Sequence, residues 1–163
     1  MQPRGPLMIE HRLIERMVEL LRNEQSRIES VDELDPAFIT RAVDFMRIYA
    51  DRTHHGKEED ILFAGLADKE LSAEHDAVMQ QLIAEHRYAR DLTGSLVKAR
   101  DEFVKGDAEA LGRASSLLIS ITELYPQHIA REDNLFFPAA MEYLSQNEQQ
   151  NMLERFREFD RKM

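Results

Sequence analysis

Cysteine is absent from the 163-residue sequence. This absence excludes disulfide frameworks, zinc ribbons, thiol catalysis and iron–sulfur clusters ligated by the chain itself, and it suits a reducing compartment. The first 20 residues also lack a long apolar run, because charged residues such as Glu10, Arg12 and Glu15 interrupt it. We therefore expect no signal peptide, no membrane span and a cytoplasmic location.

Positive charge is in short supply, with 21 Lys and Arg against 31 Asp and Glu and a net charge of −10. An acidic surface repels phosphates, so we expect no nucleic-acid partner. Most of the acidic residues are expected on solvated helix faces, since charged side chains are seldom buried. Hydrophobic residues make up 43% of the chain, which is ordinary for a soluble globular protein. The length fits a single domain over residues 1–163.

The sequence has no alternating β pattern and no low-complexity tract, and its apolar residues recur with the period of an α-helix. Asp35 and Pro36 are typical of a helix start, Ser72 can cap a third helix, and Gly106 followed by Asp107 indicates a stop and a restart. Four long helices joined by short loops predict an all-α fold, an up-down-up-down four-helix bundle. The helices are expected over about residues 7–29, 36–65, 72–104 and 107–143.

A short fifth helix is expected over about residues 145–162, after the bundle at about residues 7–143. Ser145 and Glu148 have the spacing of a capping box at its start. Its apolar stripe would pack on the bundle or on a second subunit, and it consists of Met152, Phe156, Phe159 and Met163. The sequence therefore leaves the oligomeric state open.

The six histidines are the main candidates for chemistry. A lone histidine on an apolar face is more often a hydrogen-bonded core residue than a ligand, so their arrangement decides. Each of the four long helices places one histidine on its apolar face, where both ring nitrogens would need partners. These four are His11, His54, His86 and His128. His55 shares its helical line with polar residues and is kept as an alternative to His54.

The heights of the histidines along the bundle separate them further. If neighbouring helices alternate in direction, His54, His86 and His128 lie within about 5 Å of one another along the axis, at 1.5 Å per residue. His75 lies roughly 16 Å from His86 along the same helix. We therefore interpret His75 as a residue near a helix N-terminus and keep it only as an alternative ligand.

Two histidines are followed by a glutamate four residues later, which places both side chains on one helix face. The pairs are His54 with Glu58 and His128 with Glu132. The spacing alone is common, and Glu59, four residues after His55, remains an alternative ligand. The surrounding segments HHGKEEDILF and HIAREDNLFF also match at the basic residue, a second acid and an aromatic residue. Each pair would present one nitrogen and one oxygen to the bundle axis.

One early histidine, then HHxKEExxLF, then EH, then HxxxEDxxxFP resembles the pattern of the hemerythrin-like, or HHE cation-binding, family over about residues 7–143. The resemblance implies a four-helix bundle around two iron ions with an oxo or hydroxo bridge. By position it implies Glu58 and Glu132 as bridging carboxylates and four histidines as terminal ligands. These are His11, His54, His86 and His128.

Two departures argue against simple oxygen carriage. Leu82 and Arg90 lie one turn either side of His86, where oxygen carriers have a further histidine, and Glu132 replaces their aspartate. The chain is thus more similar to bacterial members with four histidines and two glutamates, which resemble proteins linked to nitric-oxide stress and the repair of iron clusters.

Imidazole and carboxylate ligands suit iron, and also manganese or zinc. Partners that hydrogen-bond to metal ligands fix the rings, and we expect Tyr49 and Tyr125 in this role. A ferritin-like oxidase is disfavoured because no histidine follows a glutamate by three residues. A zinc hydrolase is disfavoured because His-Glu-x-x-His is missing.

Three functions remain. The first is a di-iron protein that binds, senses or reduces dioxygen, nitric oxide or peroxide, with an oxidoreductase activity and an electron donor if it turns over. The second is an iron-handling protein that gives iron to an acceptor protein. The third is a metal-free helical module that binds a partner through the apolar stripe of the fifth helix.

Overall fold

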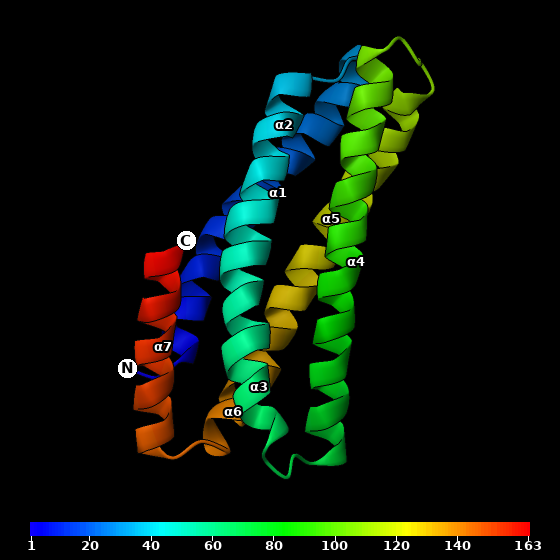
Figure 1. Ribbon diagram of the computed structural model, residues 1–163. Coiled ribbons are helices and arrows are strands. Elements are labelled where there is room, and N and C mark those ends of the chain that lie inside the picture. The colour runs from blue at the N-terminus through cyan, green and yellow to red at the C-terminus, as the bar shows by residue number, and fades with distance from the viewer.

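The computed structural model describes residues 1–163 and consists of helices without strands (Figure 1). The second of its four long arms is a continuous run of four helical segments, and the fourth arm is a run of three. The elements are α1 (Arg4–Val31); α2 (Pro36–Phe45), η1 (Met46–His55), η2 (Glu58–Phe63) and α3 (Ala64–Ala67); α4 (Ala73–Val104); α5 (Ala110–Arg131), η3 (Glu132–Phe136) and α6 (Phe137–Glu142); and α7 (Gln146–Lys162).

The all-α prediction is confirmed, and Figure 1 shows the four arms side by side, with α7 against the lower part of the bundle. In that view the chain rises along α1, returns along α2, rises along α4 and returns along α5. This path is compatible with the predicted up-down-up-down bundle. No helix is long and apolar enough to cross a membrane.

Capping side chains set most helix starts where the sequence indicates them. The Asp35 carboxylate accepts hydrogen bonds from two backbone N–H groups of the first turn of α2, with Pro36 at its first position. Ser72 caps α4, and the capping box of Ser145 and Glu148 opens α7. These three predictions are confirmed.

The expected start of the fourth long helix at residue 107 is wrong. Gly106 does end α4, with φ of 99°, a left-handed conformation that suits glycine. The Asp107 carboxylate then accepts a hydrogen bond from the Glu109 backbone at 3.0 Å inside a turn. That turn takes up three residues, and α5 begins only at Ala110.

Three π-helical segments, η1, η2 and η3, occur only in the second and fourth arms, and no pattern in the sequence predicts them. In a π-helix the backbone carbonyl of residue i accepts a hydrogen bond from the N–H of residue i+5. The helix is therefore wider than an α-helix, and different side chains share a face. His54 and His55 end η1, Glu58 begins η2 and Glu132 begins η3. The irregular backbone therefore coincides with the repeated histidine–glutamate motif, as π-helical turns often do at functional sites.

The apolar core is divided into two clusters by a polar layer. One cluster has 20 buried residues and the other has 14. Along α1 the chain passes from Leu7 of the smaller cluster, through His11, to Ile14 of the larger one. Because the other arms follow the same order or its reverse, buried polar residues lie sandwiched between two apolar regions.

Helix α7 packs on its own bundle. Met152 and Phe156 are buried within the smaller apolar cluster, and Phe159 packs against it. The sequence left open whether this stripe meets the bundle or a second subunit, and the structure places it on the bundle. The metal-free module proposed for this stripe therefore loses the surface it would need.

Candidate metal centre

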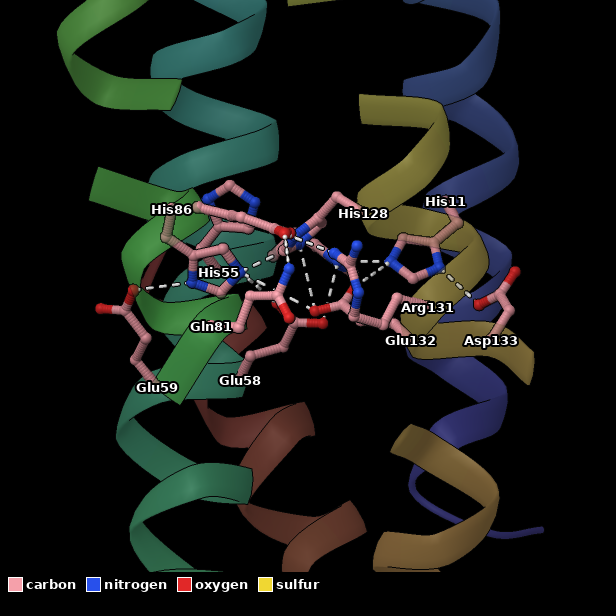
Figure 2. A network of polar contacts seen from close by, with 12 residues as sticks. His11, His55, Glu58, Glu59, Gln81, His86, His128, Arg131, Glu132 and Asp133 are labelled. Carbon is pink, nitrogen blue, oxygen red and sulfur yellow. Dashed lines mark hydrogen bonds and ion pairs between the residues drawn. The ribbon is translucent and has the colours of Figure 1, made fainter. Parts of the chain in front are cut away.

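Five histidines and two glutamates meet in the polar layer. All seven residues are buried, each exposing 4% of its surface or less. They come from all four long arms: His11 from α1, His86 from α4, and the others from the π-containing arms. Figure 2 shows Glu58 and Glu132 between the rings, with His55 and His86 to one side and His11 to the other.

The ligand atoms form two groups, and within each group they lie within 4.8 Å of one another. The first group comprises His11, His54, Glu58 and Glu132, and the second comprises His55, Glu58, His86 and His128. Within the groups ring nitrogens converge: the Nε2 atoms of His11 and His54 are 2.9 Å apart, and those of His86 and His128 are 3.2 Å apart. We call these groups the two-histidine half and the three-histidine half.

Each glutamate faces both halves. Glu58 places Oε1 3.2 Å from Nε2 of His54 and Oε2 3.3 Å from Nε2 of His86. Glu132 places Oε2 3.1 Å from Nε2 of His11 and Oε1 3.1 Å from Nε2 of His128. One oxygen of each carboxylate is thus turned to each half.

None of these four carboxylate oxygens has a hydrogen-bond partner, although all four are buried. A buried carboxylate without partners is costly, and such groups usually pair or bind a cation. The donor set combines four oxygens with five converging imidazole nitrogens, which suits a transition metal. The residues present therefore fit a pair of metal ions.

Each of the five imidazole rings in the layer is hydrogen-bonded through Nδ1 to a carboxylate on the side away from the centre. The distances between Nδ1 and the carboxylate oxygen are 2.7 Å for His11–Asp133, 2.7 Å for His54–Glu10, 3.2 Å for His55–Asp51, 2.8 Å for His86–Glu59 and 2.6 Å for His128–Glu85. An ionised carboxylate only accepts hydrogen bonds, so Nδ1 carries the proton. This tautomer leaves the Nε2 lone pair free for a metal and makes it more basic.

Four of these carboxylates lie around the bundle, and each connects one arm to a histidine of a neighbouring arm. Glu10 of α1 supports His54 of the second arm, Glu59 of that arm supports His86 of α4, Glu85 of α4 supports His128, and Asp133 supports His11. Each of the four directly neighbours a candidate ligand in sequence. Such a neighbour points about one quarter-turn around the helix from the ligand and so meets the ring of the adjoining helix. This adjacency is the sequence signal by which they could have been found.

The tyrosines do not have the role expected of them. The hydroxyl groups of Tyr49 and Tyr125 bond to none of the five rings, because the carboxylates already occupy every Nδ1. Tyr125 instead stacks on His55, with ring centroids 6.4 Å apart, and Tyr49 stacks on Phe45. Glu59, kept as an alternative ligand, belongs to neither group. Its carboxylate accepts hydrogen bonds from Nδ1 of His86 and from Arg90.

His55 lies inside the layer, contrary to the expectation that it faces the polar side of its helix. It is buried, and its ring stacks on that of His86 with centroids 3.8 Å apart. The wider turn of η1 explains the error, because a period of 3.6 residues no longer describes which side chains share a face. His54 and His55 therefore both lie in the layer, His54 in the two-histidine half and His55 in the three-histidine half.

His75 lies at the first turn of α4, away from both halves. Its Nδ1 atom is 2.7 Å from the Tyr143 hydroxyl, and its backbone is capped by Ser72. This is the helix N-terminal position expected for it.

Burial and neighbouring charges shift the pKa values of the histidines in this layer in different directions. Burial lowers the pKa of both His11 and His128, but nearby carboxylates outweigh it and raise both to about 9: Asp133 and Glu132 act on His11, and Glu132 and Glu85 act on His128. The pKa of His55 instead falls to about 3, because burial and the neighbouring His86 both oppose its charge. Burial raises the pKa of Glu58 and Glu132, yet the surrounding rings lower both overall. Without metal, ionised carboxylates and protonated histidines therefore neutralise one another.

Fold and site together define a helical protein with a candidate dinuclear metal centre. Residues 5–140 match the hemerythrin HHE cation binding domain, so the chain belongs to this family, whose membership suggests that it binds a metal. The chain is also 24% identical over 150 residues to uncharacterised proteins of Mycobacterium bovis and Mycobacterium tuberculosis. The match covers 92% of this chain but 58% of each relative. No solved structure matches the chain.

Two histidine variants separate ligands from bystanders. We expect His55→Ala to lower the metal content from two ions to one per chain, because the three-histidine half loses a nitrogen. His75→Ala should leave both ions in place, because His75 belongs to neither half. Elemental analysis of the desalted proteins, with circular dichroism to check folding, measures this. A full complement of metal in His55→Ala would remove His55 from the ligand set.

Proposed function

We propose that this chain is a non-haem di-iron protein that binds, senses or reduces a small oxidant such as dioxygen, nitric oxide or peroxide. The observation that carries the proposal is the placement of Glu58 and Glu132. Each directs to each half of the centre one buried oxygen that has no hydrogen-bond partner, as a carboxylate shared by two cations would.

The candidate ligands would be divided between two ions. His11 and His54 would hold one ion, three histidines would hold the other, and the two glutamates would bridge them. Iron, manganese and zinc all accept this ligand set. A bound pair of iron ions supplies the redox electrons that the side chains lack. Since the two-histidine half offers one nitrogen fewer, it leaves more room for a small ligand.

The surroundings keep the centre rigid and buried. The Nδ1 carboxylates fix the five rings, so the Nε2 atoms already point inward before metal arrives. Apolar clusters flank the layer on both sides. Their contact with the layer strengthens electrostatic interactions inside it, because the local dielectric is low.

The iron-donor alternative needs metal to leave. All seven candidate ligands are buried, so an acceptor protein could reach the ions only after a local opening of the bundle. This burial favours retention of the metal and reaction with molecules of a few atoms.

Anaerobic loading with ferrous iron tests the proposal. We expect two ions per chain, and near-ultraviolet absorption that changes when dioxygen, peroxide or nitric oxide is added in stoichiometric amounts. The variant His128→Ala should not show these changes. One zinc ion, no metal, or two irons inert to all three oxidants would overturn the proposal. Rapid transfer of iron to an apo-protein would favour iron handling instead.

A further inference from the structure

A lysine is completely buried beside the candidate metal centre. The side chain of Lys57 has 0% exposure, and its Nζ atom lies 5.9 Å from the centre of the Phe156 ring. Burying an ammonium group is costly unless it is paired. Lys57 donates to Glu10 and, at 2.7 Å, to Asp160 of α7.

These contacts connect the C-terminal helix to one histidine of the layer. Glu10 accepts from Lys57 at Oε1 and from Nδ1 of His54 at Oε2, the latter at 2.7 Å. The connection therefore runs from Asp160 through Lys57 and Glu10 to His54. It joins α7, α1 and the second arm.

The other four carboxylates that bond to histidine rings are paired with arginines, whereas Glu10 is paired with a lysine. Asp51 and Glu59 share Arg90, Glu85 pairs with Arg131, and Asp133 pairs with Arg12. These arginine side chains are 25% to 55% exposed. Only the carboxylate that holds His54 is paired with a buried amine, and only this one is linked to α7.

The backbone next to His54 also depends on α7. A Cβ atom placed on Gly56 would lie 2.8 Å from Cζ of Phe159, so glycine alone lets α7 approach the turn that follows His54 and His55. Helix α7 lies outside residues 5–140, the part of the chain that the family domain matches. The contact is therefore a feature of this chain beyond the matched domain.

We propose that Lys57 is a positioning residue that makes the orientation of the His54 ring, and so metal binding in the two-histidine half, depend on the docking of α7. Docked α7 presents Asp160, which holds Lys57 against Glu10, and Glu10 in turn holds His54. Loss of Asp160 or Lys57 frees Glu10 to turn away from the ring. The metal-binding part of this inference rests on the proposed dinuclear centre, whereas the ring orientation does not.

The test compares Lys57→Met and Asp160→Asn with Lys69→Met. Lys69 pairs with Glu148 of α7, so it also tethers that helix, but it contacts no ring-holding carboxylate. In the metal-free protein, nitrogen NMR of the histidine rings should show that His54 loses its Nδ1–H hydrogen bond to Glu10 in the first two variants. The His128 signals should stay unchanged in those variants, and Lys69→Met should leave both rings as in the wild type.

Metal titration gives the second readout. Lys57→Met should weaken one of the two sites by about 10-fold to 100-fold, as removal of a partner that supports a ligand does. Asp160→Asn should act in the same direction, and it serves alone if Lys57→Met does not fold, because the Asp160 side chain is 47% exposed. Wild-type His54 signals in the folded variants, or the same changes in Lys69→Met, would overturn the inference. If no metal binds, the proposed function is refuted. The NMR comparison then still tests whether Lys57 positions the His54 ring.

Discussion

Glu58→Gln should empty both halves of the metal centre, whereas the same change at the neighbouring Glu59 should leave both occupied. Glu58 turns one oxygen to each half and bonds to nothing else. A neutral amide in its place removes a negative charge shared by both ions. We expect an affinity loss above about 100-fold, because losing a supporting partner alone costs about 10-fold to 100-fold. Metal content should therefore fall from two ions to less than one per chain.

Glu59→Gln is the matched control because it alters the adjacent residue on the same helix. Glu59 supports the His86 ring and pairs with Arg90 from a partly exposed position. At saturating metal this variant should keep two ions, with a weaker site in the three-histidine half. Elemental analysis and competitive titration against a chelator measure both variants. If Glu58→Gln retained two ions, the bridging role of Glu58 would be refuted.

The local parts of this fold were predictable because they depend on neighbouring residues. Asp35, Ser72 and Ser145 cap helices through backbone groups two or three residues away, and a sequence shows such spacing directly. The inward position of His11 and His86 follows equally from the helical period, since α1 and α4 are regular.

The second arm was less predictable because its backbone departs from the α-helix. The π-helical turns of η1 bring both His54 and His55 inward, and only packing in the folded protein selects such turns. Asp51 supports the His55 ring from one turn away on that arm. The carboxylates Glu10, Glu85 and Asp133 act on rings 43 to 122 residues distant in sequence. In a chain with 31 acidic residues, nothing but their adjacency to ligands sets them apart from solvated surface groups.

In the metal-free protein, stability should fall as pH rises from about 6.5 to about 9. The pKa of His11 and of His128 is about 9 in the folded chain, above the ordinary value of 6.5. A raised histidine pKa contributes stability that is complete below the unfolded value and is lost as pH passes the folded one. Each shift corresponds to a loss on the order of 3 kcal/mol. His54 and His86, whose pKa values are also raised, act in the same direction.

Metal binding should have the opposite pH dependence, because a metal takes the neutral imidazole and displaces its proton. The stabilisation that added metal gives should therefore grow over the range in which the metal-free protein weakens. Thermal unfolding at several pH values, with and without metal, measures both trends. Asp133→Asn removes the hydrogen bond that does most to raise the pKa of His11, so in this variant the metal-free fall should be smaller and should end at lower pH. A metal-free midpoint that stayed constant from pH 6.5 to 9 would show that the rings are neutral already, and that the carboxylates of the layer are balanced by something other than protonated histidine.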